Sequence, residues 1–376
     1  MAGTSNVVAT VDTVNANIDT AFVPGAVATI TLTTPVNGAV ADGANSNSVQ
    51  AVVSDSDGNA VTGATVVFSS ANATAQITTV IGTTGADGIA TATLTNTVAG
   101  TSNVVATIDT VNANIDTTFV AGAVATITLT TPVNGAVADG ANSNSVQAVV
   151  SDSGGNVVTG ATVVFSSTNA TAQITTVIGT TGADGIATAT LTNTVAGTSN
   201  VVATIDTVNA NIDTAFVAGA VATITLTAPV NGAVADGADT NQVDALVEDA
   251  NGNPITGAAV VFSSANGATI LSSTMNTGVN GVASTLLTHT VAGTSNVVAT
   301  VDTVNANIDT TFVAGAVATI TLTTPVNGAV ADGANSNSVQ AVVSDSDGNP
   351  VTGAAVVFSS ANATAQITTV IGTTGA

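Results

Sequence analysis

Residues 87–120 read DGIATATLTNTVAGTSNVVATIDTVNANIDTTFV. This stretch decides the fold class of the chain. Its apolar residues stand at every second position in two runs: Ala90, Ala92 and Leu94, then Val104, Ala106 and Ile108. Such alternation is typical of a strand that buries one face. IDTTFV at 115–120 is a third run, and the segments NTVAGTSN and DTVNAN between the runs are rich in turn-forming residues. The stretch therefore predicts three consecutive antiparallel strands.

Four more runs of the same kind precede this stretch. They lie at 28–33, 49–53, 64–68 and 75–81, separated by segments such as AVADGANSNS and SDSDGNAVTG. The residues predicted to face inward in the first of these strands are Ala28, Ile30 and Leu32. Seven short strands joined by polar turns predict an all-β, immunoglobulin-like Greek-key β-sandwich.

The whole unit is repeated in tandem. The string AGTSNVVAT starts at Ala2, Ala99, Ala196 and Ala292, so successive copies begin 97, 97 and 96 residues apart. A period of this length matches a sandwich that buries its own core. The predicted complete repeats are 24–120, 121–217 and 218–313, with 1–23 as the C-terminal hairpin of a truncated repeat and 314–376 as the N-terminal part of another. Because only one or two residues separate successive repeats, we expect them to form an extended rod.

The charged residues exclude several classes of function. The chain has no Lys or Arg, 23 acidic residues and a formal net charge of −23. Without cations it cannot neutralise phosphates, so nucleic acid and anionic membrane surfaces are excluded as partners. It has no run of 18 uncharged apolar residues, so this segment is not expected to insert into a membrane. It also lacks Cys and has one His, His289, so no catalytic constellation is predicted and the chain is not expected to be an enzyme.

The order of the motifs resembles a known family. The first repeat contains, in this order, the motifs ADG, DSDGN, VTGATVVFSS, TTGADGIATATLT and AGTSNVVAT. This succession is similar to that of the bacterial immunoglobulin-like domains of the invasin and intimin adhesins. The resemblance implies a structural stalk on the bacterial cell surface that holds a binding region away from it. It also implies an extracellular location, with outer-membrane anchoring through regions outside this chain and with neighbouring repeats as the main partners.

Acidic residues cluster in predicted loops. In a seven-stranded Greek key, three of the connections meet at the end where the chain enters the domain. This places the following carboxylates near one another: Asp55, Asp57, Asp87 and Asp109. Carboxylates without a cationic partner suit Ca²⁺, which prefers hard oxygen ligands, so these four are candidate calcium ligands. No other cofactor is expected. The alternative is that each Asp-Gly or Asn-Gly pair only forms a turn.

Two other functions remain open besides the stalk. The third repeat, 218–313, is more divergent and carries Asp239, Asp244, Glu248 and Met275. It could therefore be an adhesive module that binds a host or matrix surface ligand. Alternatively, the chain could be a subunit of a self-assembling extracellular filament, in which the partial ends share strands.

Overall fold

The computed structural model describes residues 2–375 and confirms the all-β class. Met1 and Ala376, the outer ends of the predicted segments 1–23 and 314–376, lie outside the described residues. The chain divides into two compact units. The first comprises Met1–Ala136, Ser143–Thr192 and Thr198–Ala215, and the second comprises Val137–Asn142, Asn193–Gly197 and Phe216–Ala376.

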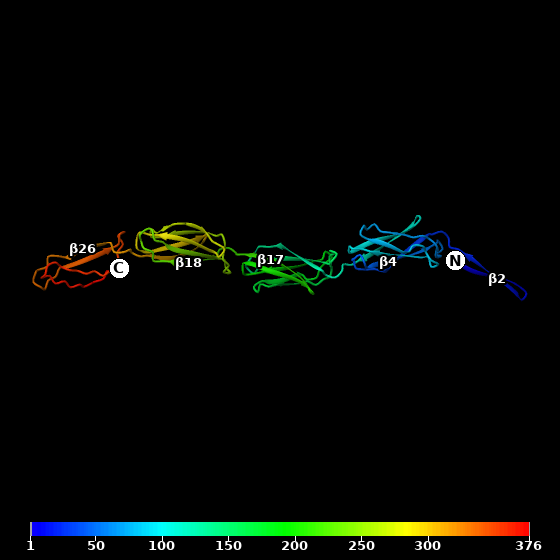
Figure 1. The fold of residues 1–376 in the computed structure, drawn as a ribbon, viewed down its shortest axis with the longest axis horizontal. Helices are drawn as coiled ribbons and strands as arrows, with labels where there is room; N and C mark the ends of the chain where they lie inside the picture. Colours follow the sequence, from blue (N-terminus) through cyan, green and yellow to red (C-terminus); the bar gives the residue numbers. More distant parts are fainter. Residues whose placement is uncertain (1, 376) are drawn as a thin grey trace. The chain divides into compact units, whose positions relative to one another are not determined.

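Repeat 24–120 is a two-sheet sandwich (Figure 1). Its strands are β3 (Thr29–Val36), β4 (Ser46–Ser54), β5 (Val67–Ser69), β6 (Gln76–Ile81), β7 (Ile89–Thr95), β8 (Gly100–Ile108) and β9 (Val111–Phe119). One sheet has the order β3-β4-β7-β6 and the other has the order β5-β8-β9. Adjacent strands in both sheets run antiparallel to each other. This division into four and three strands is that of a constant-type immunoglobulin domain and confirms the predicted Greek key.

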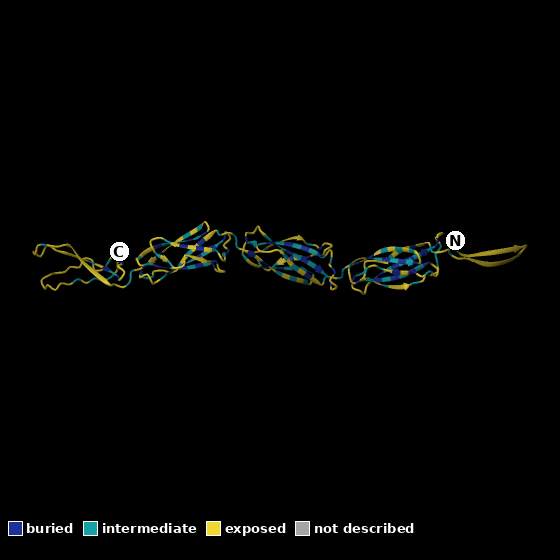
Figure 2. Cartoon of the chain, turned by 90° about the horizontal axis from the view of Figure 1, so that it is seen from above, coloured by how far each residue is buried: buried dark blue, intermediate teal, exposed yellow. Residues whose placement is uncertain are grey.

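The core lies between the two sheets. Along β4 every second residue is buried, with Val49, Ala51 and Val53 at most 1% exposed, as the period-2 pattern predicts. Figure 2 shows buried and exposed stretches alternating within the sandwich. Ile30 also joins this core. Ala28 was predicted to face inward, but it is exposed and lies one residue before the start of β3, at Thr29.

Repeat 121–217 has the same architecture. Its strands are β10 (Thr126–Val133), β11 (Ala136–Val137), β12 (Ser143–Ser151), β13 (Val164–Ser167), β14 (Gln173–Ile178), β15 (Ile186–Thr192), β16 (Gly197–Ile205) and β17 (Val208–Val217). The sheets run β10-β12-β15-β14 and β11-β17-β16-β13. The additional strand β11 is short, and the corresponding position in the first repeat forms a single parallel bridge between Val40 and Val120.

Repeat 218–313 departs from this plan in one place. Its strands are β18 (Thr223–Val230), β19 (Asn241–Glu248), β20 (Ala259–Ser264), β21 (Thr269–Ile270), β22 (Thr274–Asn276), β23 (Val282–Thr288), β24 (Gly293–Val301) and β25 (Val304–Phe312). The sheets run β18-β19-β23-β21 and β22-β20-β24-β25. The start of the segment that forms β14 in the second repeat is here the two-residue strand β21. β22 pairs with β20 of the opposite sheet at three positions, where the second repeat has the single bridge between Thr162 and Thr180.

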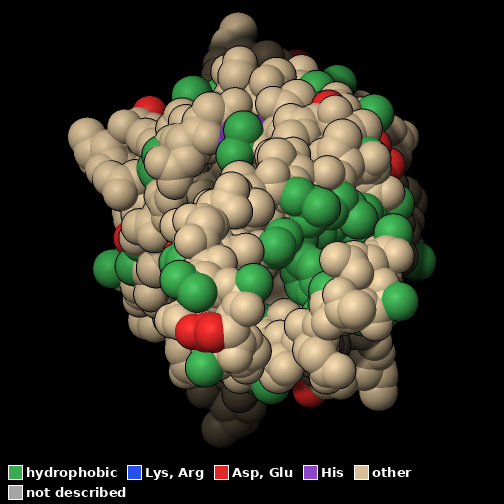
Figure 3. Space-filling model, turned by 90° about the vertical axis from the view of Figure 1, so that its left-hand side faces the viewer, with side chains coloured by type: hydrophobic (Ala, Val, Ile, Leu, Met, Phe, Trp, Pro, Cys, Tyr) green, Lys and Arg blue, Asp and Glu red, His purple; other side chains and the backbone are tan. Residues whose placement is uncertain are grey.

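The two flanking segments leave apolar side chains exposed. β1 (Gly3–Val11) and β2 (Val14–Phe22) pair as a hairpin in which every residue is exposed. β26 (Thr319–Val326) and β27 (Ser338–Ser344) also pair. Ile320 is 58% exposed, whereas Ile30, at the same place in the first repeat, is 9% exposed. Figure 3, which faces the end of the chain bearing β26, shows hydrophobic side chains gathered in a hollow.

Candidate functional site: the repeat junctions

The topology brings the loops of the four predicted calcium ligands to one end of repeat 24–120. Asp55 and Asp57 follow β4, Asp87 precedes β7, and Asp109 joins β8 to β9. The pairing of Val67, at the start of β5, with Thr107, near the end of β8, puts the last of these loops at the same end as the first. The described residues nevertheless contain no group of three or more acidic, His or Cys side chains placed to hold a metal ion.

Asp55 is buried, and its carboxylate accepts hydrogen bonds. Oδ2 accepts from the Gly25 N–H at 2.8 Å, and Oδ1 accepts from the backbone N–H groups of Asp57 at 3.0 Å and Asn59 at 2.9 Å. The side-chain amide of Asn59 also donates to Oδ2 at 3.0 Å. The Asn59 amide, followed by the Gly25 N–H, lowers the pKa of Asp55 from 3.8 to about 2, because these donors stabilise the ionised form.

The other three acids are exposed and lie in turns. Asp87 Oδ1 accepts from the N–H of Ile89 at 3.1 Å, which closes the turn before β7. Asp109 has a φ of 48°, a left-handed conformation that Asp tolerates better than most residues. Asp57 stands beside Gly58, which has a φ of 81°. Each acid therefore has a local role in a turn, and calcium binding by this group stays a prediction.

The junction between the first two repeats contains a buried amide that the calcium hypothesis did not use. Asn156, of repeat 121–217, accepts at Oδ1 from the Ala99 N–H of the preceding repeat at 2.8 Å. Its Nδ2 donates to the carbonyl oxygens of Thr97 at 3.2 Å and Ala41 at 3.4 Å, and to Asp152 Oδ2 at 3.0 Å. All five residues belong to the first compact unit. Asn156 therefore links two loops of one repeat to a carboxylate of the next.

Asp152 connects Asn156 to the first residues of repeat 121–217. Its Oδ2 accepts at 2.8 Å from the N–H of Gly122, which lies at the start of the repeat, immediately after the junction. Burial alone would raise the pKa of Asp152. The Gly122 N–H and the Asn156 amide outweigh that effect, and the pKa is lowered. We call this Asp–Asn pair, with its equivalents, the junction clasp.

The junction clasp recurs in the second compact unit. Asn253 accepts from the Ala196 N–H at 2.7 Å and donates to the Thr194 carbonyl at 3.0 Å, while Asp249 accepts from the Gly219 N–H at 2.8 Å. The pair Asp345 and Asn349 makes the same contacts to Gly315, Ala292 and Thr290. Asp55 and Asn59 form the corresponding pair in the first unit, where Asn59 accepts from the Ala2 N–H at 2.8 Å.

Sequence reasoning missed the asparagine of the clasp. An Asn after Asp-Gly is typical of a turn, and nothing in one copy of SDSDGN distinguishes a turn former from a residue that contacts another repeat. The available signal was recurrence. Asp57 becomes Gly154 in the next copy, whereas the asparagine is kept at Asn59, Asn156, Asn253 and Asn349.

His289 has a structural environment at the end of β23. Its Nδ1 accepts from the Thr290 N–H at 3.0 Å, so Nε2 carries the proton and donates to the Asn266 carbonyl at 2.7 Å. Its ring lies edge-on to Phe312, with the ring centroids 5.7 Å apart. Both ring nitrogens are engaged by the backbone.

The family of the chain follows from a comparison with family models. The model described as bacterial Ig-like domain (group 1) matches four times, at 29–120, 126–217, 223–313 and 319–376, which is well over half of the chain. The chain belongs to the bacterial Ig-like domain family, group 1. The predicted family is thereby confirmed, and these Ig-like repeats are of the kind found in bacterial adhesins.

Solved structures share the fold of these bacterial Ig-like repeats. FdeC, an adhesin of Escherichia coli, is 24% identical with a TM-score of 0.56, and the match covers 77% of this chain and 99% of FdeC. InvD of Yersinia pseudotuberculosis is 21% identical with a TM-score of 0.54, covering 75% of this chain and 96% of InvD. Invasin, a bacterial integrin-binding protein, is 25% identical with a TM-score of 0.48, covering 80% of this chain and 63% of invasin.

Among the described residues, no helix is long and apolar enough to cross a membrane.

Proposed function

We propose that these repeats form a structural stalk of a bacterial surface adhesin, outside the cell, which holds a binding region away from the surface. Anchoring in the outer membrane is assigned to regions outside this chain. A stalk has no need of catalysis, and the chain is proposed to act without an enzymatic step. Its main partners are its own neighbouring repeats.

The recurring junction clasp is the observation that carries the proposal. A stalk keeps its reach only if its junctions resist bending, and a flexible linker would let the repeats fold back. Here a short junction, Val120-Ala121-Gly122, is braced by a buried Asn and a buried Asp. Bonds between buried polar groups are costly to break without replacement, so the clasp restrains the angle between adjacent repeats.

The height to which the chain lifts an epitope above a cell surface tests the proposal. The chain is placed between an outer-membrane anchor and a fluorescent epitope, and the height of the epitope above the membrane is measured. Deleting 121–217 joins Val120 to Ala218 and recreates a natural junction, because Val217-Ala218-Gly219 has the same sequence as Val120-Ala121-Gly122. The height should fall by about 35–40 Å, the length of one repeat. An unchanged height would refute the stalk.

A further inference from the structure

The third complete repeat carries a set of changes on the outer face of one sheet. Along β19 the buried residues Asn241, Val243, Ala245 and Val247 are the same as those of β4. The outward residues between them all differ: Gln242, Asp244, Leu246 and Glu248 replace Ser48, Gln50, Val52 and Ser54. The core of the strand is kept while its outer face has a new chemistry.

The neighbouring strand β23 continues the same surface. Leu286 stands opposite Gln242, Ser284 opposite Asp244, and Val282 opposite Leu246. Leu286 replaces a threonine of the earlier repeats, Thr93 and Thr190. In the opposite sheet, by contrast, β24 and β25 repeat the sequences of β8 and β9 with one change, at Val301. The altered outward residues of β19 and β23 therefore lie on one sheet face, which we call the third-repeat face.

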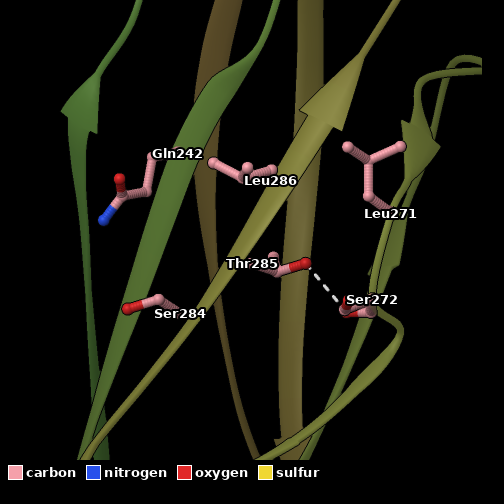
Figure 4. Close-up of a pocket in the computed structure, with 6 residues that line it drawn as sticks. All are labelled: Gln242, Leu271, Ser272, Ser284, Thr285 and Leu286. Carbon is pink, nitrogen blue, oxygen red and sulfur yellow. Dashed lines mark hydrogen bonds between the residues drawn. The ribbon is translucent and has the colours of Figure 1, made fainter.

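A hollow opens where this face meets the segment that follows β21. In the second repeat β14 pairs with β15 from Gln173 to Ile178. In the third repeat β21 pairs with β23 only at Thr269 and Ile270, and β22 then pairs with β20 of the other sheet at three positions, where the second repeat has one bridge. The hollow has a volume of about 320 Å³ and is lined by Gln242, Leu271, Ser272, Ser284, Thr285 and Leu286 (Figure 4).

The lining of the hollow is fixed in place and partly apolar. Thr285 Oγ1 donates to the Ser272 carbonyl at 2.8 Å (Figure 4). The Leu271 N–H donates to the Leu286 carbonyl at 2.9 Å. Leu271 is 54% exposed and Leu286 is 40% exposed. In the first repeat the equivalent positions are Thr78 and Thr93, so both exposed leucines are particular to this face.

The charges on this face determine the kind of partner. Asp244 and Glu248 have no acidic counterpart in the first repeat, and the chain has no Lys or Arg to pair with them. A second copy of the chain would bring further negative charge and no cation. Neither Trp nor Tyr occurs in the chain to stack against a sugar ring. Electrostatic complementarity therefore favours a basic protein surface.

We propose that the third-repeat face binds a segment of another protein in which an apolar side chain stands between basic residues. The apolar side chain occupies the hollow between Leu271 and Leu286. The basic side chains face Asp244, next to the hollow, and Glu248, further along β19. This activity is additional to the stalk, because it uses a sheet face and none of the junction residues.

A binding measurement on the full chain tests this proposal. The probe is a fluorescent peptide of alternating Lys and Leu, and a second peptide carries Ser in place of each Leu. The reverted chain carries Leu271→Thr, Leu286→Thr, Asp244→Gln and Glu248→Ser, each restoring the residue of the first repeat. A control chain carries Asp116→Asn and Asp213→Asn, which remove the same charge from exposed positions in other repeats.

The proposal expects the reverted chain to bind the Lys–Leu peptide at least tenfold more weakly, and the control chain to bind it within about twofold of the parent. Hydrogen exchange with the peptide bound should slow in β19 and β23 and stay unchanged in β4 and β7. Equal binding by parent and reverted chains would overturn the proposal. So would equal binding of the Lys–Ser peptide, which needs charge alone, or dimerisation of the parent chain that the reversion abolishes. If the reverted chain melts early, the charge pair and the leucine pair are reverted separately.

Discussion

Replacing Asn156 by Ala should loosen the connection between repeats 24–120 and 121–217 more than it destabilises either repeat. The substitution removes the acceptor for the Ala99 N–H and the donor to the Thr97 carbonyl, and it takes one amide away from Asp152. Leaving buried polar groups without partners costs about 1–3 kcal/mol. For a repeat of this size, each kcal/mol corresponds to a fall in melting temperature of about 4–8 °C.

Asn144→Ala is the matched control. Asn144 is 0% exposed, against 9% for Asn156, and lies in the same repeat. Its Oδ1 accepts from the Ala136 N–H and its Nδ2 donates to the Ala215 carbonyl, both at 2.9 Å. These bonds stay within one repeat. Asn144→Ala should therefore lower the melting temperature by a similar amount without freeing the junction.

Distance distributions between two spin labels distinguish a loosened junction from a loss of stability within one repeat. The chain has no Cys, so Thr78→Cys and Thr175→Cys, at equivalent exposed positions in the two repeats, provide two unique labels. The distribution should be narrow in the parent chain, broad in Asn156→Ala and narrow in Asn144→Ala. If Asn156→Ala leaves the distribution as narrow as the parent does, the clasp is not what restrains the junction.

Three further predictions concern acid, calcium and the flanking segments. Because the folded-state pKa of Asp55 is lowered from 3.8 to about 2, its contribution to stability is complete above pH 4 and is lost as the pH falls toward 2. Asp55→Asn should flatten that part of an unfolding-versus-pH curve, and an unchanged curve would contradict the assignment. The calcium hypothesis predicts a rise in melting temperature that is specific to Ca²⁺ and disappears in Asp57→Gly, whereas equal shifts with Mg²⁺ and Na⁺ at matched ionic strength would reduce it to screening. Hydrogen exchange should be fast in β1, β2 and β26, whose residues are all exposed, and slow in β4, β12 and β19; equal protection throughout would mean that the flanking segments are covered in solution.

Much of the fold could be predicted from the sequence because side-chain alternation in strands is a strong local signal. Val49, Ala51 and Val53 alternate with polar residues, and this pattern fixes both the strand and its buried face. The exposed Ala28 shows the limit of this reasoning, since the pattern does not mark where along a strand the covering of the inner face begins. The pairing of β22 with β20 was also missed. It depends on hydrogen bonds between strands, such as that from the Phe262 N–H to the Ser273 carbonyl, which no local pattern reports.

The functional residues were harder to predict because they act between segments distant in the sequence. Topology correctly placed the loops of Asp55, Asp87 and Asp109 at one end of the sandwich. It gave no indication that the carboxylate of Asp55 is occupied by N–H donors. Asn156 binds Ala99, 57 residues earlier in the chain, so its role can be seen only when two repeats are present together.

Small-angle X-ray scattering of the whole chain tests the central claim, that successive repeats form a stiff spacer, most directly. Three complete repeats of about 35–40 Å each should give a rod-like particle at least about 110 Å long, with a radius of gyration above about 30 Å. Asn156→Ala should shorten the average dimension. A compact particle with a radius of gyration near 21 Å, as expected for a globular chain of about this length, would contradict the account.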